Sequence, residues 1–302
     1  TKFVDGRLLV KVTDVVREQH DEQWFYDLST ASQNYSADGV IVHNTWVCTA
    51  GFGNKARTRF GEHNGVADVQ NGNLGSWKVL SDLGFGTTFS VIQGIDQAVK
   101  WGAKIISMSL GGPMQGSVDE DPQVRIIEKL KDQVLFVIAA GNDGSNGDWS
   151  VNSPGVAPSA VTVGAYSSVY CEVSEFSSRG PSGPWYKDKP GLWRKDLAKF
   201  GDDLFKPDLV APGGGPSRKD QKMDLILSGV VGWIQPMYVI LPDIWGALRG
   251  TSMATPLAAG VLALAYEHGL IRTARDVKEK MARWGGKDTT VGYGMITYPK
   301  LI

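Results

Sequence analysis

Apolar residues along residues 77–140 change spacing from extended to helical and back. Helical spacing is found between Phe89 and Trp101, and again between Val124 and Leu130. Short apolar runs lie beside these segments, at Trp77–Leu80, Lys104–Leu110 and Val134–Ala140. Strands that are apolar on both faces and are joined by helices predict a parallel sheet with helices on both sides. We therefore expect an α/β fold with buried central strands.

A second helix signal lies near the C-terminus. The run Thr255–Gly269 is rich in alanine and leucine and contains Gly260, which predicts a helix packed among close neighbours. It follows directly on Gly250-Thr251-Ser252. A serine that follows a glycine at a strand-to-helix turn exposes its hydroxyl, and its own N–H lies at the positive end of the helix dipole. The structural alternative for a Gly-x-Ser sequence is that the serine caps the N-terminus of the helix.

Two more segments follow expected strands. Ser109-Leu110-Gly111 ends one strand, and Ala140-Gly141-Asn142 ends the next. Ligands of open α/β sheets bind beyond the carboxyl ends of the strands, so both segments are candidates for a site. Taken alone, the first is also consistent with a strand and turn, and the second with an Asn-Asp-Gly turn.

Together, residues 108–112, 139–144, 176–181, 205–213 and 250–256 resemble the signature segments of the subtilisin-like serine proteases, or subtilases. The resemblance implies a subtilisin-like three-layer fold with a mainly parallel sheet. It also implies a serine endopeptidase in which Ser252 is the nucleophile and the Asn142 side-chain amide stabilises the oxyanion. The substrate-binding residues that it implies are Ser109, Leu110, Gly111, Ala140 and Gly141.

The resemblance further implies an aspartate and a histidine upstream of the serine. No histidine of this chain lies in the family's His-Gly-Thr motif, and no Asp-Ser/Thr-Gly element is found. Residues 45–51 resemble the family's histidine helix, beginning just after the His-Gly. We therefore expect the triad aspartate and histidine to lie outside this chain.

The residues before Thr45 resemble a different family. Trp24–Leu28 and Asn34–Asn44 are similar to the C-terminal end of an intein, a self-excising insert of all-β Hedgehog/intein fold. That resemblance implies that Asn44 cyclises, that His43 protonates the departing group and that Thr45 receives the upstream acyl group. Two domains follow from it: an intein fragment at 1–44 and an incomplete subtilase domain at 45–302. The alternative for residues 1–44 is an ordinary β-hairpin appended to a protease.

Two functional hypotheses remain open. In the first, an upstream intein and protease segment, in the same chain or as a separate partner, must be joined before the protease acts on a peptide or protein substrate. In the second, a degenerate subtilase serves as a non-catalytic peptide-binding module. Subtilases are often exported, so an extracellular location is the default expectation.

Composition narrows the other possibilities. The net charge is −1 and charged residues make up 21% of the chain, so the composition shows no excess of basic residues that would indicate a nucleic-acid partner. Cys48 and Cys171 are too few for a disulfide framework or a zinc site, and we expect both to be small buried residues. Prolines interrupt the apolar stretch Leu225–Trp245, which favours short strands over a membrane span. Neither chemistry requires a metal or an organic cofactor.

Two segments are longer than the corresponding parts of short subtilases: 182–204 and 214–249. Each carries tryptophans, which either line a cleft or pack the insertion. Packing is the interpretation that we favour for Trp185, Trp193, Trp233 and Trp245.

Overall fold

The computed structural model describes residues 2–4, 7–9, 12–20, 23–30, 44–53, 56–58, 61–67, 74–81, 84–216, 223–229, 239–241 and 245–302. Within residues 2–30 the described elements are two antiparallel pairs. Strand β1 (Lys2–Val4) pairs with β2 (Arg7–Leu9), and β3 (Val12–His20) pairs with β4 (Gln23–Thr30). Wherever the structure describes residues 2–30, they are β-strands.

A mainly parallel sheet forms the centre of the molecule. Strands β7 (Ile105–Met108), β8 (Leu135–Ala139) and β9 (Val161–Ser167) are parallel neighbours, and β11 (Leu209–Pro212) pairs in parallel with β9. The short β10 (Glu172–Val173) pairs antiparallel with the end of β9. All five residues of β8 are buried, as the apolar run at 134–140 predicts.

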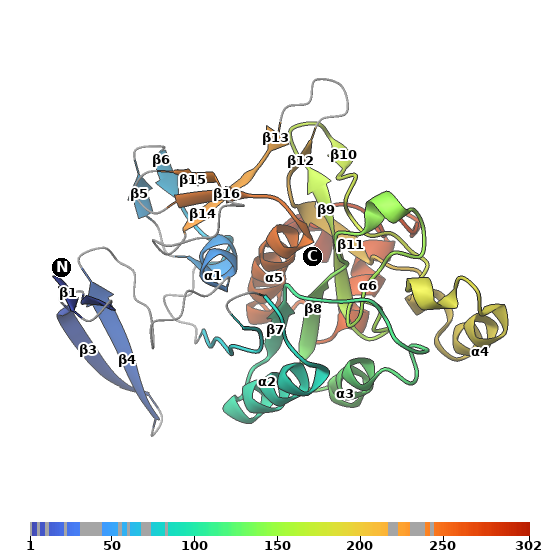
Figure 1. Ribbon diagram of the computed structural model, residues 1–302, viewed down its shortest axis with the longest axis horizontal. Coiled ribbons are helices and arrows are strands. Elements are labelled where there is room, and N and C mark those ends of the chain that lie inside the picture. The colour runs from blue at the N-terminus through green and yellow to red at the C-terminus, as the bar shows by residue number, and fades with distance from the viewer. Residues whose placement is uncertain are drawn as a thin grey trace.

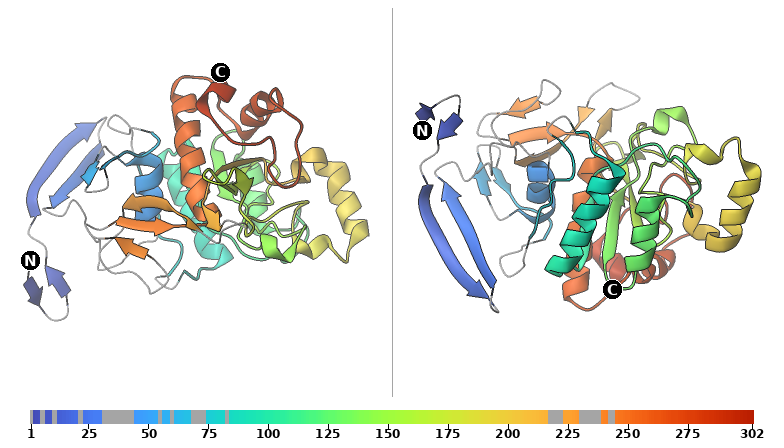
Figure 2. Two further views of the ribbon diagram at one scale, coloured as in Figure 1. Left: turned by 90° about the horizontal axis from the view of Figure 1, so that it is seen from above. Right: turned by 60° about the horizontal axis from the view of Figure 1, so that its bottom comes forward.

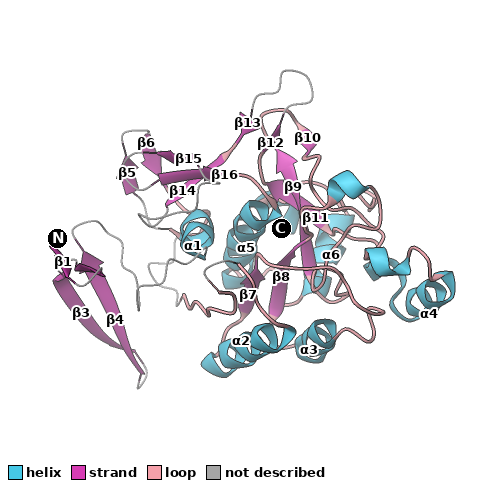
Figure 3. Ribbon diagram, in the orientation of Figure 1, coloured by secondary structure: helices cyan, strands magenta, loops and turns pink. Residues whose placement is uncertain are grey.

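Helices cover both faces of the sheet, which makes the three layers visible in Figure 3. On one face, α5 (Thr251–Glu267) and α6 (Ala274–Ala282) enclose a core that includes Leu135, Val163 and Leu262. On the other face, α2 (Thr88–Trp101) and α3 (Pro122–Leu130) pack over Phe136 and Ile138. The sequence prediction of an α/β fold with a covered parallel sheet is confirmed.

Helix α1 (Asn44–Phe52) packs directly on α5, on the side away from β9 in Figures 1 and 2. Val47 lies in one apolar cluster with Met253, near the start of each helix. Further along, a Cβ on Gly51 would lie 2.7 Å from the Pro256 carbonyl oxygen, and one on Gly260 would lie 2.7 Å from the Gly51 carbonyl oxygen. The N-terminal part of α1 thus contacts the N-terminal part of α5, and the C-terminal part of α1 contacts residues further along α5. The two helices therefore run in the same direction.

The first insertion forms a small helical unit at one end of the molecule. It contains η2 (Pro184–Tyr186), α4 (Pro190–Phe200) and η3 (Gly201–Leu204). The Trp193 ring lies edge-on to Trp149, with 4.8 Å between centroids, and 5.2 Å from Tyr186. Trp185 also contacts Tyr186. These two tryptophans pack the insertion, as favoured above. Trp233 and the Trp245 side chain lie outside the described part.

Short strands and 3-10 turns complete the structure. The pairs are β5 (Ala56–Thr58) with β6 (Gly61–His63), and β12 (Gly215–Pro216) with β13 (Met223–Asp224). Strands β14 (Ile226–Gly229), β15 (Val239–Leu241) and β16 (Trp245–Leu248) form an antiparallel sheet, as expected of the 225–245 region. Single 3-10 turns are η1 (Gly144–Asn146) and η4 (Tyr298–Leu301). Among the helices described, none is long and apolar enough to cross a membrane.

Two sequence expectations are wrong. The run Trp77–Leu80 is not a strand: Val79 packs against α2 instead, where its side chain meets Gly94. Cys171 is not buried but exposed, because it occupies a turn with φ +55° between β9 and β10. Cys48 is half-buried in α1, and burial raises the pKa of its thiol.

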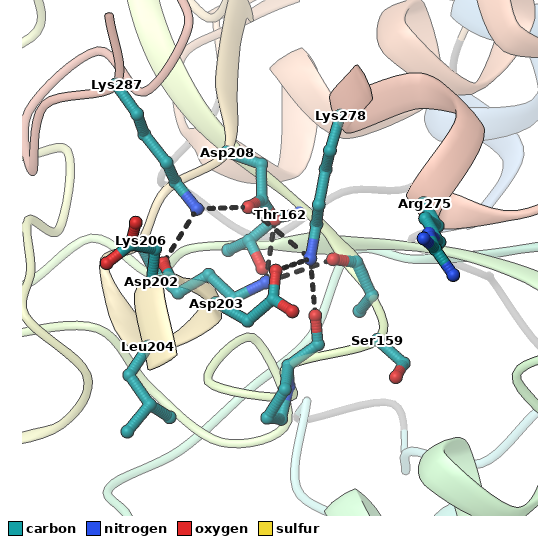
Figure 4. A network of polar contacts seen from close by, with 12 residues as sticks. Ser159, Thr162, Asp202, Asp203, Leu204, Lys206, Asp208, Arg275, Lys278 and Lys287 are labelled. Carbon is teal, nitrogen blue, oxygen red and sulfur yellow. Dashed lines mark hydrogen bonds and ion pairs between the residues drawn. The ribbon is translucent and has the colours of Figure 1, made fainter. Parts of the chain in front are cut away.

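A buried ion network ties the start of β11 to α6 and the C-terminal loop (Figure 4). The Asp208 carboxylate lies 2.7 Å from both Lys206 Nζ and Lys287 Nζ, and 3.7 Å from Lys278 Nζ. Lys278 also binds Asp203 at 2.7 Å. The backbone N–H of Thr162 donates to the same carboxylate. One buried anion therefore serves three ammonium groups from different elements.

Candidate functional site

The structure places Ser252 in the first turn of α5, directly after β16 and Gly250. Gly250 has φ 147°, a value that residues with a side chain rarely adopt. A Cβ at this position would also lie 3.7 Å from the side-chain amide atoms of Asn142. The glycine therefore lets the chain enter the helix sharply while Asn142 approaches closely.

The Ser252 side chain is half-buried and reaches the end of β7. Its Oγ donates to the Ser109 carbonyl oxygen at 3.3 Å, and the Ser109 hydroxyl donates back to the Ser252 carbonyl oxygen at 3.0 Å. Among the described residues, no hydrogen-bond partner is found for the Ser252 N–H. This N–H belongs to the unpaired first turn of a long helix, where the dipole favours negative charge.

Asn142 lies beside Ser252 with its amide orientation fixed by Thr251. The Asn142 Oδ1 accepts from the Thr251 N–H at 2.9 Å and from the Thr251 hydroxyl at 3.1 Å. Both partners are donors, so the oxygen must face Thr251 and the NH₂ group must point away. The side chain is exposed, and its Nδ2 is a donor available to a ligand. Sequence reasoning gave Thr251 no role, although it stands in the nucleophile motif.

Hydrogen bonds from Ser178 and Asn152 hold the loop that carries Asn142 on the side away from Thr251. The Ser178 hydroxyl accepts from the Asp143 N–H at 3.0 Å, and the Ser178 N–H donates to the Gly141 carbonyl at 3.0 Å. Asn152 donates from its side chain to the Asp143 carboxylate. Ser178 belongs to the 176–181 segment singled out from the sequence, and its contacts show how that segment supports the site.

The predicted substrate-binding residues fall into two groups. Ala140 is fully buried, and both of its backbone groups are bonded, to Val163 and to Asn152. Gly141 likewise uses its N–H on Thr251 and its carbonyl on Ser178. By contrast, Leu110 and Gly111 show no backbone hydrogen bonds within the described part of the chain. Only the second group is free to pair with an added peptide.

Among the described side chains, no histidine is hydrogen-bonded to Ser252. His268 caps the opposite end of α5, where its Nδ1 contacts the Tyr298 hydroxyl. At about 1.5 Å rise per residue, His268 lies roughly 24 Å along the helix from Ser252. His43 lies outside the described residues. Asn44 and Thr45 are placed only as backbone in the first turn of α1, so their side chains are not described.

The described residues form neither a metal site nor a second polar site. No group of three or more His, Cys, Asp or Glu side chains is arranged to hold a metal ion there. A hollow of about 400 Å³ lies beside α5 and β11. Its lining, which includes Leu257, Val261 and Ile296, has no charged side chain, so it offers no acid or base.

Comparison with known proteins identifies the family. The model of the Subtilase family matches residues 6–294. The chain belongs to the subtilase family. Pyrolysin of Pyrococcus furiosus is 36% identical over 198 residues, which are 62% of this chain and 13% of pyrolysin. Serine protease AprX of Bacillus subtilis is 30% identical over 289 residues, 87% of this chain and 57% of AprX.

A solved structure supports the subtilase fold assignment. The crystal structure of a lanthipeptide protease superposes with a TM-score of 0.55 at 20% identity, covering 74% of this chain and 68% of that one. This subtilase spans 57% or less of the lengths of pyrolysin and AprX. The family match begins at residue 6, so it extends over most of the segment for which the sequence suggested an intein.

Proposed function

We propose that residues 45–302 are the nucleophile-bearing part of a subtilisin-like serine endopeptidase. The observation that carries this is the pairing of Ser252 with Asn142 at the start of α5. A hydroxyl, an unpaired backbone N–H and an oriented amide NH₂ come together there. In acyl transfer, Ser252 would attack the scissile carbonyl. Its own N–H and Asn142 Nδ2 would stabilise the oxyanion, a contribution of about 3 kcal/mol per donor.

The substrate would bind as an extended strand along Ser109–Gly111. Glycine at 111 allows another backbone to come close, and the unused backbone groups of Gly111 can form a short ladder with a peptide. Ala140 and Gly141 would form the wall beside the scissile bond rather than pair with it. The substrate class is therefore an extended peptide or protein segment.

The proposal includes an incomplete triad. A base and an orienting carboxylate would come from an upstream protease segment, because the sequence has neither the family's His-Gly-Thr motif nor an Asp-Ser/Thr-Gly element. Loss of the base lowers kcat by about 10⁶-fold in a subtilisin. We expect this chain alone to be inactive toward peptides until the upstream segment is joined.

We further propose that residues 1–44 are the C-terminal end of an intein. In this reaction the Asn44 side-chain nitrogen attacks its own carbonyl carbon, which forms a succinimide and breaks the Asn44–Thr45 bond. His43 donates the proton that the departing Thr45 amine requires. The support is the His-Asn-Thr sequence at the point where the subtilase His-Gly would stand. The strands β1–β4 fit an all-β fragment.

Two assays test the protease. Hydrolysis of a fluorogenic peptide should be absent for this chain alone and present after the upstream segment is joined, with Ser252→Ala as the inactive control. A fluorophosphonate probe should then label Ser252. Normal turnover by the chain alone would contradict the incomplete triad. A joined protein whose Ser252 stays unlabelled would favour the non-catalytic peptide-binding module.

Mass spectrometry tests the intein. Incubation should slowly release a fragment that begins at Thr45, and the Asn44→Ala variant should release none. Asn64→Ala is the matched control, because Asn64 lies outside the proposed intein fragment. Equal release from Asn44→Ala and the unaltered chain would rule out Asn cyclisation while leaving the protease proposal intact.

A further inference from the structure

The chain that leads into α5 crosses the carboxyl edge of the central sheet from one side to the other. The Gly250 N–H donates to a carbonyl just beyond β11. The Thr251 N–H donates to Asn142, which follows β8, and the Ser252 hydroxyl donates to Ser109, which follows β7. Strands β7 and β11 lie on opposite sides of the β8–β9 pair. The residue before Gly250 therefore lies on the side of the sheet away from Ser109.

That residue is Arg249, the last residue of the long segment 214–249. Arg249 is exposed, and its guanidinium carbon lies 5.8 Å from the centre of the Phe176 ring. A Cβ on Gly214 would lie 3.3 Å from the Arg249 Cβ, so the side chain starts beside the residues that follow β11. Arg249 thus puts a positive charge on the opposite side of Ser252 from the proposed substrate strand.

The Phe176 ring gives the guanidinium a fixed support. Phe176 is half-buried and packs against the core that α5 and α6 enclose. Its carbonyl accepts from the Gly144 N–H at 2.8 Å, two residues after Asn142. An arginine that lies over an aromatic ring can still donate from its N–H groups to a carboxylate. Arg249 and Phe176 therefore form a shelf that can bind an anionic side chain beside the candidate site.

The path of a bound peptide leads toward this shelf. A peptide that pairs antiparallel with Ser109–Gly111 runs against the direction of β7, so its leaving-group residues continue beyond Ser252. The reacting carbonyl would be held between Ser252 and Asn142, and Arg249 lies on the far side of both from the proposed substrate strand. Leaving-group residues that continue across this edge of the sheet reach the Arg249 side chain.

We propose that Arg249, supported by the Phe176 ring, binds an acidic side chain on the leaving-group side of the scissile bond. This rests on the proposed function and narrows its substrate class to peptides with Asp or Glu within three residues after that bond. Arg249 stands three residues before Ser252, so their Cα atoms are at most about 11 Å apart, a distance that three extended residues span. The planar guanidinium can hold a carboxylate through two parallel N–H···O bonds.

Peptide turnover by the joined protein tests the Arg249 site. The probes are three pairs of peptides of one common sequence, with Glu or Gln at the first, second or third position after the scissile bond. Mass spectrometry confirms where each peptide is cut. In at least one pair, kcat/KM for the Glu peptide should exceed that for the Gln peptide by about three- to fivefold, which is the range of an exposed ion pair.

Charge variants assign the preference to one side chain. Arg249→Gln should bring the two rates of that pair within about twofold of each other, and Arg249→Glu should favour a Lys peptide over the Glu peptide. Arg275→Gln is the matched control, because it removes an exposed arginine of α6 that pairs with Glu279. The control should keep the full preference for Glu. Salt at about 0.5 M should reduce the preference, because it screens exposed charges.

Equal rates for Glu and Gln at all three positions, or a preference for Glu that survives Arg249→Gln, would overturn the Arg249 site. Calorimetric titration of the same peptides into this chain needs no hydrolysis, so it separates the two proposals. If the joined protein hydrolyses no peptide, tighter binding of a Glu peptide that is lost in Arg249→Gln contradicts the proposed function and leaves the Arg249 site standing. No hydrolysis and no difference in binding between Glu and Gln peptides would overturn both.

Discussion

Ser109 and Ser252 exchange hydrogen bonds between the end of β7 and the start of α5. The reason lies four residues further along the helix. An α-helix would normally bond the Ser252 carbonyl to the N–H of residue 256, but Pro256 has none. The Ser109 hydroxyl donates to this carbonyl instead. A proline inside the helix thus creates the acceptor that fixes the predicted nucleophile against the sheet.

We expect Ser109→Ala to lower the free energy of unfolding by about 1 kcal/mol, because the Ser252 carbonyl loses its donor. Urea unfolding measures this, and Ser109→Thr, which keeps the hydroxyl, should cost less. In a Pro256→Ala background the new N–H can reach the Ser252 carbonyl, so the cost of Ser109→Ala should shrink. Equal costs in both backgrounds would show that the two positions are not coupled.

Periodicity predicted those elements whose packing follows from their own sequence. The apolar spacing of 89–101 and 124–130 gives α2 and α3, and the unbroken apolar run before Ala140 gives β8. The nucleophile motif was also found without the structure, because glycine, serine and an alanine-rich helix follow one another in sequence. Local signals suffice where local chemistry decides the conformation.

Contacts between distant residues were not predictable in this way. Trp77–Leu80 has the composition of a strand, but Val79 packs on α2 instead of pairing. Nothing near Asn142 in sequence shows that Thr251 fixes its amide, since the two lie 109 residues apart. The exposure of Cys171 depends on a left-handed turn that its sequence neighbours do not signal. Each case depends on a partner that only the folded chain supplies.

The close contact between α1 and α5 makes Gly260 sensitive to any side chain. A Cβ there would lie 2.7 Å from the Gly51 carbonyl oxygen and 2.7 Å from Val66 Cβ. We expect Gly260→Ala to destabilise the chain by about 1–3 kcal/mol through overpacking, despite the better helix propensity of alanine. Gly191 in α4 has open space around its Cβ position. Gly191→Ala should therefore be neutral or stabilising in the same thermal unfolding assay.

Because several lysines share the Asp208 carboxylate, replacing Asp208 should destabilise the protein more than replacing any one lysine of the network. Asp208→Asn leaves the buried ammonium groups of Lys206 and Lys287 without their anion, although Lys278 keeps Asp203, and should cost about 3–5 kcal/mol in urea unfolding. Lys206→Met should cost less, because Lys278 and Lys287 still pair with the carboxylate. Burial lowers the pKa of Lys206 to about 7 despite Asp208, so this lysine already bears a desolvation cost. Asp203→Asn, at a half-exposed carboxylate, should cost under about 1 kcal/mol.

Asp208 should also make the protein sensitive to acid. Burial raises its pKa, but Lys206, Lys278 and Lys287 outweigh burial and hold the pKa well below the ordinary range. The folded pKa is thus lower than the unfolded value of about 3.9, so the stabilisation is complete above that pH and declines as the pH falls below it. The difference in unfolding free energy between the unaltered chain and Asp208→Asn should shrink by about 1.4 kcal/mol per pH unit below pH ~3.5. A difference that stays constant from pH 6 to pH 2.5 in urea unfolding would show that folding does not shift the pKa of Asp208.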